Sequence, residues 1–66
     1  MKEYGIIKEY DGYCGIISGI NNIDYLLLKK DILYENVVKG DIVIFTAEEL
    51  AVNNEIRLIA RFVEKK

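Results

Sequence analysis

The amino-acid sequence predicts an all-β fold, a five-stranded antiparallel Greek-key barrel built by one domain that spans residues 1–66. Two observations support this prediction. Short apolar runs rich in Ile, Val, Leu and Tyr are separated by pairs of Gly, Asn and Asp, which favour turns. The longest irregular connection, residues 29–38, lies between the third and fourth runs, as in a small barrel of the OB type. An SH3-like barrel has a similar strand count and is the alternative.

The turn signals set the limits of the expected strands. An Asp-Gly pair between two apolar runs, here Asp11-Gly12, predicts a tight first hairpin. Residues 29–38 lose the alternation of a strand, which predicts a loop or a short 3₁₀ turn. Thr46 and Glu49 have the spacing of a helical capping box, but a single isolated turn is marginal, so we expect an acidic loop. The strands are expected at residues 4–10, 13–18, 23–28, 41–45 and 55–63.

Composition restricts the function. The chain has no histidine and one cysteine, so the residues best suited to acid–base catalysis and metal binding are absent or single. We therefore expect no enzyme, no cofactor and no metal, and we expect Cys14 to be a small packing residue. No signal peptide or apolar run long enough to cross a bilayer is present, which predicts a cytoplasmic protein without a membrane partner. A net charge of −2 argues against a strongly basic nucleic-acid binder.

Four segments carry a resemblance to a known family. Gly5–Lys8 matches an opening Gly-x-Val-Lys strand, and Gly12–Ile17 stands where the first ribonucleoprotein motif, Lys-Gly-Phe-Gly-Phe-Ile, is found. Asp24–Ile32 parallels Asp-Val-Phe-Val-His-x-Ser-x-Ile, and Gly40–Phe45 keeps the pattern Gly-x-x-Val-x-Phe. In order and spacing the chain resembles the cold-shock domain family. That resemblance implies an OB fold that binds single-stranded RNA or DNA by stacking outward aromatic side chains on bases.

The functional positions depart from the family pattern. Only Tyr10 keeps an aromatic ring at a stacking position. Non-aromatic residues occupy the other family positions, namely Glu9, Cys14, Ile16, Leu26 and Leu28. Each stacked base contributes about 1–3 kcal/mol to binding. The loss of three stacks therefore weakens the affinity by about a hundredfold or more. The resemblance is therefore strong for the framework and weak for the binding surface.

The register of the first hairpin determines which side chains share a face. A two-residue Asp11-Gly12 turn would place Tyr10 opposite Tyr13, and with Lys8 they would form an aromatic and cationic platform. The family alignment instead places Tyr13 inside the barrel with Ile17. A slip of one residue exchanges the inner and outer faces of a strand. The two arrangements of Tyr13 are therefore compatible only if the hairpin contains a bulge. We expect the simple hairpin, with an irregularity near Gly15.

Two functions follow from these patterns. The first is weak, low-specificity binding of single-stranded RNA or DNA, in which tyrosines stack on bases, lysines hold phosphates and aliphatic side chains pack against sugar and base. The alternative is a protein-interaction or self-associating module, including a homodimer, that uses an aliphatic face in place of the stacking aromatics. The expected nucleic-acid-binding residues are Lys8, Tyr10, Tyr13, Ile16, Leu26, Leu28 and Lys29.

Overall fold

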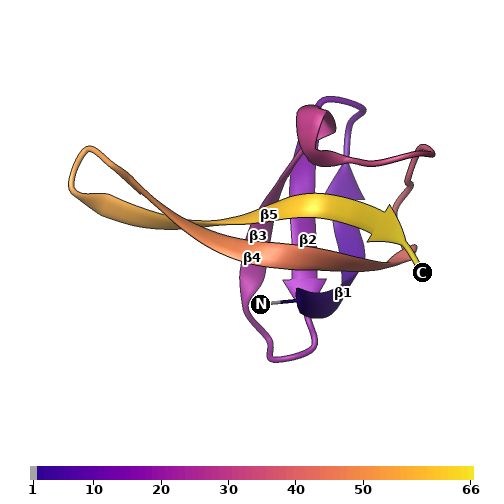
Figure 1. Ribbon diagram of the computed structural model, residues 1–66, viewed down its shortest axis with the longest axis horizontal. Coiled ribbons are helices and arrows are strands. Elements are labelled where there is room, and N and C mark those ends of the chain that lie inside the picture. Colours follow the sequence, from indigo (N-terminus) through magenta and orange to yellow (C-terminus); the bar gives the residue numbers. More distant parts are fainter. Residues whose placement is uncertain (1) are drawn as a thin grey trace.

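The computed structural model describes residues 2–66, which form a closed barrel of five strands (Figure 1). Neighbours in the barrel follow the order β1-β2-β3-β5-β4, and β4 closes it against β1. Four strand pairs are antiparallel and β3 pairs with β5 in parallel. The predicted five-stranded barrel is confirmed, with one parallel contact among the antiparallel ones. The elements are β1 (Lys2–Tyr10), β2 (Cys14–Gly19), β3 (Asp24–Leu28), the 3₁₀ turn η1 (Lys29–Asp31), β4 (Ile42–Val52) and β5 (Glu55–Lys65).

Alternation along the strands fills the barrel with aliphatic and aromatic side chains. On β3, Tyr25 and Leu27 are buried, and the Tyr25 ring packs edge-on against Phe45 with centroids 4.9 Å apart. Leu26 and Leu28, two of the expected binding residues, therefore face outward, because successive side chains of a strand point to opposite sides. The other fully enclosed residues come from all remaining strands and one loop: Ile7, Ile17, Val37, Val43, Ala60 and Val63.

The first hairpin turns one residue later than expected. The backbone N–H of Asp11 donates to the carbonyl of Cys14 at 3.1 Å, so Gly12 and Tyr13 occupy the centre of the turn. Gly12 has a φ of 96°, which suits glycine. Tyr10 is therefore opposite Gly15 and not opposite Tyr13, and the predicted pairing of the two tyrosines is wrong.

Neither register considered for this hairpin holds, because Tyr13 is exposed in the turn and a bulge at Lys8 changes the pairing within the hairpin. The pairing passes from Ile7 with Ile17 directly to Glu9 with Ile16, which leaves Lys8 as the extra residue of β1. Gly15 lies beside this bulge, and a Cβ there would overlap the carbonyl oxygen of Glu9. The predicted irregularity near Gly15 is present, although the extra residue belongs to the facing strand.

The expected acidic loop after the fourth strand is wrong, as is the helical turn considered for the same residues. β4 continues through these residues to Val52 and pairs with β5 along a long antiparallel hairpin (Figure 1). Asn53 and Asn54, with φ of 50° and 66°, form its turn, as a two-residue turn with positive φ requires. Cross-strand pairing thus overrides a capping-box pattern that would have formed one isolated helical turn.

Strict alternation of buried and exposed residues fails at two places in β5. Ile59 and Ala60 are both buried, and Phe62 is exposed with a φ of 51° where the register between β4 and β5 shifts. Bulges of this kind bend a strand around a barrel. Within residues 2–66, no helix is long and apolar enough to cross a membrane.

Candidate nucleic-acid interface

The outer face of β2 and β3 is aliphatic. Cys14 lies opposite Leu28, and Ile16 lies opposite Leu26. Cross-strand neighbours point to the same side of a sheet, so these four side chains form one surface, which we call the outer β2–β3 face. Cys14 is exposed, which makes the expectation that it is a packing residue wrong, while the other three are half-buried.

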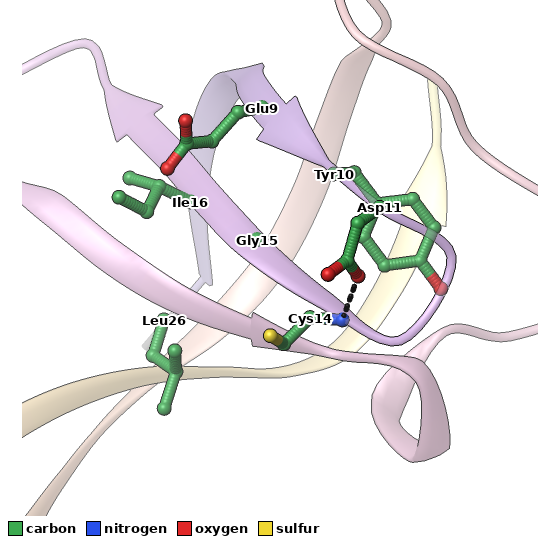
Figure 2. Close-up of a pocket in the computed structure, with 7 residues that line it drawn as sticks. All are labelled: Glu9, Tyr10, Asp11, Cys14, Gly15, Ile16 and Leu26. Atoms are coloured by element: carbon green, nitrogen blue, oxygen red, sulfur yellow. Dashed lines mark hydrogen bonds between the residues drawn. The ribbon is translucent and has the colours of Figure 1, made fainter.

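Glu9 borders this face as a consequence of the bulge. It lies opposite Ile16, and Figure 2 shows its carboxylate beside Ile16 in a shallow hollow on the outer β2–β3 face. In the described part of the chain, no lysine or arginine lies within ion-pair distance of this carboxylate. A negative charge therefore stands at the edge of the aliphatic surface, where it repels phosphate.

Tyr10 lies at the border of this surface, where it lines the same hollow as Glu9 and Ile16 (Figure 2). It is half-buried, packs against the core, and lies opposite the buried Gly15. Burial raises the pKa of its hydroxyl, with smaller contributions from Asp11 and Cys14. Residue 10 is therefore an edge residue of the core, and the expected platform of Lys8, Tyr10 and Tyr13 does not form.

Lys8 is separated from Tyr13 by the length of the face. Its ammonium lies 3.3 Å from the Asp24 carboxylate, with both side chains more than half exposed. Ion pairs of this kind contribute little stability, yet the carboxylate offsets much of the field of the lysine. Lys8 is thus a weak candidate for a phosphate contact.

Tyr13 and Lys29 come together at the opposite end of the face. Tyr13 is 75% exposed, and the Lys29 ammonium lies 5.6 Å from its ring centroid. The backbone N–H of Lys29 donates to the Tyr13 carbonyl at 3.0 Å, which fixes η1 beside the first turn. Within residues 2–66 no carboxylate pairs with Lys29. An open aromatic ring and a cation are therefore held side by side.

Asp11 holds the turn that presents Tyr13. Its carboxylate accepts hydrogen bonds from the backbone N–H groups of Tyr13 at 2.8 Å and Cys14 at 2.9 Å. These hydrogen bonds hold the pKa of Asp11 below its usual value. The side chain thus serves the turn, and its charge is directed at backbone donors.

Both arginines are paired with carboxylates. Arg61 joins β5 to η1 and β4, with 3.2 Å to Asp31 and 3.5 Å to Glu48, while Arg57 lies 3.6 Å from Glu55. Arg61 therefore supports the fold, whereas the exposed Arg57 lines a hollow with Ile16 and Leu26, where Glu55 offsets its charge.

The sequence did not reveal two residues that lie near the outer β2–β3 face. Tyr34, which is not among the expected binding residues, is 89% exposed with a φ of 70° and borders a small pocket that Lys29 also lines. The sequence pattern placed Glu9 with the side chains of Cys14 and Ile16, but could not locate the bulge that brings Glu9 to their edge. Positive φ at a tyrosine has no signal in composition or alternation, so only the structure identifies this position.

Comparison with known proteins finds a structural likeness without a sequence relative. No protein-family model matches the chain, and no curated protein matches it. Among solved structures, a chain described as "drosophila Unr CSD456" superposes with a TM-score of 0.84 at 17% sequence identity. The match covers 100% of the present chain and 27% of that chain. The present chain therefore corresponds to about a quarter of the length of the structure it matches.

Proposed function

Because this chain has the fold of the cold-shock domains, we propose that it binds single-stranded RNA or DNA weakly and with little sequence preference. Domains of this fold generally bind single-stranded nucleic acids and are typically non-catalytic. In this proposal a base stacks on Tyr13, Lys29 contacts a phosphate, and sugar and base edges pack on the outer β2–β3 face. No cofactor takes part.

The observation that carries the proposal is the pairing of Tyr13 with Lys29. Single-strand binding without sequence preference needs an accessible aromatic ring for stacking and a nearby cation for the backbone. Both are present at one end of the outer β2–β3 face, and the Asp11 hydrogen bonds hold the turn that presents the ring. Leu26 and Ile16 continue the surface with apolar side chains that accept any base.

The same surface accounts for the low affinity in the proposal. One exposed tyrosine at about 1–3 kcal/mol replaces several stacking rings. Asp24 offsets Lys8, and Glu9 adds a repulsive charge beside Ile16. We therefore expect dissociation constants well above those of domains that carry a full set of stacking aromatics.

The test is the affinity of the Tyr13→Ala variant for a fluorescently labelled oligothymidine at low salt. We expect a loss of about five- to a hundredfold, because one stack of about 1–3 kcal/mol is removed. Lys29→Ala should also weaken binding, by loss of a cation beside the ring.

The chain offers a matched control in a second lysine–tyrosine pair. The Lys66 ammonium lies 5.3 Å from the ring centroid of Tyr4, which faces outward from β1 where β1 pairs with β4. Tyr4→Ala should leave oligothymidine affinity unchanged. Equal losses in the Tyr4 and Tyr13 variants would reject the proposed site.

A second candidate function has support from the composition of the same face. Ile16, Leu26 and Leu28 form an outward aliphatic surface, and such surfaces commonly contact proteins. A protein-interaction module would bind its partner equally well or better as salt is added, whereas nucleic-acid binding weakens with salt. The salt dependence of the natural ligand's binding therefore separates the two.

A further inference from the structure

The β4–β5 hairpin extends beyond the barrel and has unpaired edges. β1 pairs with β4 only as far as Thr46, and β3 pairs with β5 through Leu26 and Ile59. Within residues 2–66, the segment 55–58 of β5 therefore has a partner strand on one side only, that of β4. Figure 1 shows the hairpin projecting away from the body of the barrel.

This edge has neither proline, lysine nor a bulge. Natural edge strands are commonly blocked by these features and by other charged side chains, of which this segment carries one of each sign, Glu55 and Arg57. The chain has no proline, and residues 47–58 contain no lysine. The shift in register between β4 and β5 lies at Ile44 and Thr46, outside the projecting part. Exposed apolar side chains also lie on the hairpin, with Ile56 69% exposed and Leu50 42% exposed.

The sequence of the β5 edge is complementary to itself. Glu55 and Arg57 flank Ile56 and lie on one face of the strand, where their side chains approach within 3.6 Å. When two copies of this edge run antiparallel about a two-fold axis at Ile56, each Glu55 lies opposite an Arg57 of the other copy. Ile56 then meets its own equivalent on the other face of the sheet.

Neighbouring registers lack this complementarity. A centre at residue 55 places two Glu55 carboxylates opposite each other, and a centre at residue 57 does the same with two guanidinium groups. Like charges directly opposite destabilise a strand pair. The β4 edge has no equivalent solution, because its residues 47–52 contain Glu48 and Glu49 without a cation. One register at one edge is therefore favoured.

We propose that two copies of this chain associate through segment 55–58 of β5, antiparallel about Ile56, which joins two hairpins into a four-stranded sheet. Each interface is isologous, as a two-fold dimer requires. It forms two cross-strand pairs between Glu55 and Arg57 and one Ile56 contact. The first turn and η1, which carry Tyr13 and Lys29, lie apart from the hairpin tip (Figure 1). Residues 55–58 line one hollow with Ile16 and Leu26, so the interface adjoins the aliphatic part of the outer β2–β3 face.

Sedimentation of the full chain over a concentration series up to the millimolar range tests this interface. We expect a reversible monomer–dimer equilibrium. Arg57→Glu, by symmetry, turns two attractive pairs into two repulsive ones and should weaken the dimer by about tenfold or more. Glu55→Arg should do the same, while Lys66→Glu, a charge reversal far from the hairpin, should leave the equilibrium unchanged.

The decisive experiment is to mix the Arg57→Glu variant with the Glu55→Arg variant. Each variant alone carries like charges at residues 55 and 57, but one copy of each restores both opposite-charge pairs. An equimolar mixture should therefore form a heterodimer with an affinity near that of the original chain. Circular dichroism of each variant verifies that the barrel remains folded. Monomers at every concentration, dimers insensitive to either reversal, or no recovery on mixing would each overturn the proposal.

Discussion

At the scale of single residues, Gly15 sets how closely the two strands of the first hairpin approach. A methyl group at this position would overlap the backbone carbonyl of Glu9, which cannot move aside as a flexible side chain can. The bulge that moves Glu9 to the edge of the outer face therefore depends on glycine at position 15. Gly12 differs, because it has open space around it and needs glycine only for its φ of 96°.

Gly15→Ala should lower the free energy of unfolding by about 3 kcal/mol, at the upper end of the cost of overpacking. Gly12→Ala is the matched control and should cost only about 1 kcal/mol, the penalty of a left-handed residue with a side chain. Urea unfolding measures both losses. Equal losses in the two variants would contradict the close approach at Gly15.

Glu9 limits the affinity for nucleic acid if a strand follows the outer face. We expect Glu9→Gln to strengthen oligothymidine binding by up to about fivefold at low salt, since two unit charges 4 Å apart in water interact by about 1 kcal/mol. The gain should shrink as salt screens the charge. Glu64→Gln, which removes a carboxylate from β5, is the control. An unchanged affinity in Glu9→Gln would place the bound strand elsewhere.

At the scale of elements, the first hairpin shows how far sequence alone could go. Asp-Gly predicted the existence of a hairpin, because few other pairs tolerate a tight turn. It did not predict the register, since the Asp11 carboxylate binds the N–H groups of Tyr13 and Cys14 and moves the centre of the turn by one residue. That single shift, with the bulge at Lys8, turns Tyr10 inward and exposes Tyr13.

The Asp11 carboxylate makes this turn sensitive to acid. Its pKa in the fold lies below the usual 3.8, so its contribution to stability is complete above 3.8 and disappears as pH falls through the lowered value. Asp11→Asn keeps an oxygen that accepts the same hydrogen bonds at every pH. We expect the original chain to lose more unfolding free energy than this variant between neutral pH and acid. Identical losses would show that the carboxylate does not hold the turn.

The β4–β5 hairpin could not be predicted from the sequence. Thr46 and Glu49 fit a helix start, and the apolar residues beyond them fit a further turn of helix equally well. The strand forms because Asn53 and Asn54 reverse the chain and bring β5 alongside, a contact that no local pattern reveals. Framework positions with alternating core residues were predictable, whereas bulges and long pairings were not.

At the scale of the whole molecule, net charge conceals how the charges are paired. Lys8, Arg57, Arg61 and Lys65 each lie within 4 Å of a carboxylate, which composition could not reveal. Few cations at the proposed site are left to neutralise phosphates. Alternation predicted that Leu26 and Leu28 share one face of the third strand, but which face points outward and which carboxylate pairs with each lysine depend on the folded barrel.

This distribution predicts a shallow salt dependence. If one or two phosphates are contacted, the logarithm of the oligothymidine association constant should fall with the logarithm of salt at a slope between about −0.7 and −1.4. Titrations over a series of sodium chloride concentrations measure it. A slope steeper than about −3 would require several more cation contacts than this surface offers.

The most direct test of the central claim is a heteronuclear NMR titration of the labelled chain with a short oligothymidine at low salt. Binding at the outer β2–β3 face predicts fast-exchange shifts centred on Tyr13 and Lys29 and extending to Ile16, Leu26 and Leu28, with none at Tyr4. An absence of shifts at millimolar oligothymidine, or shifts confined to other strands, would contradict nucleic-acid binding at the outer β2–β3 face.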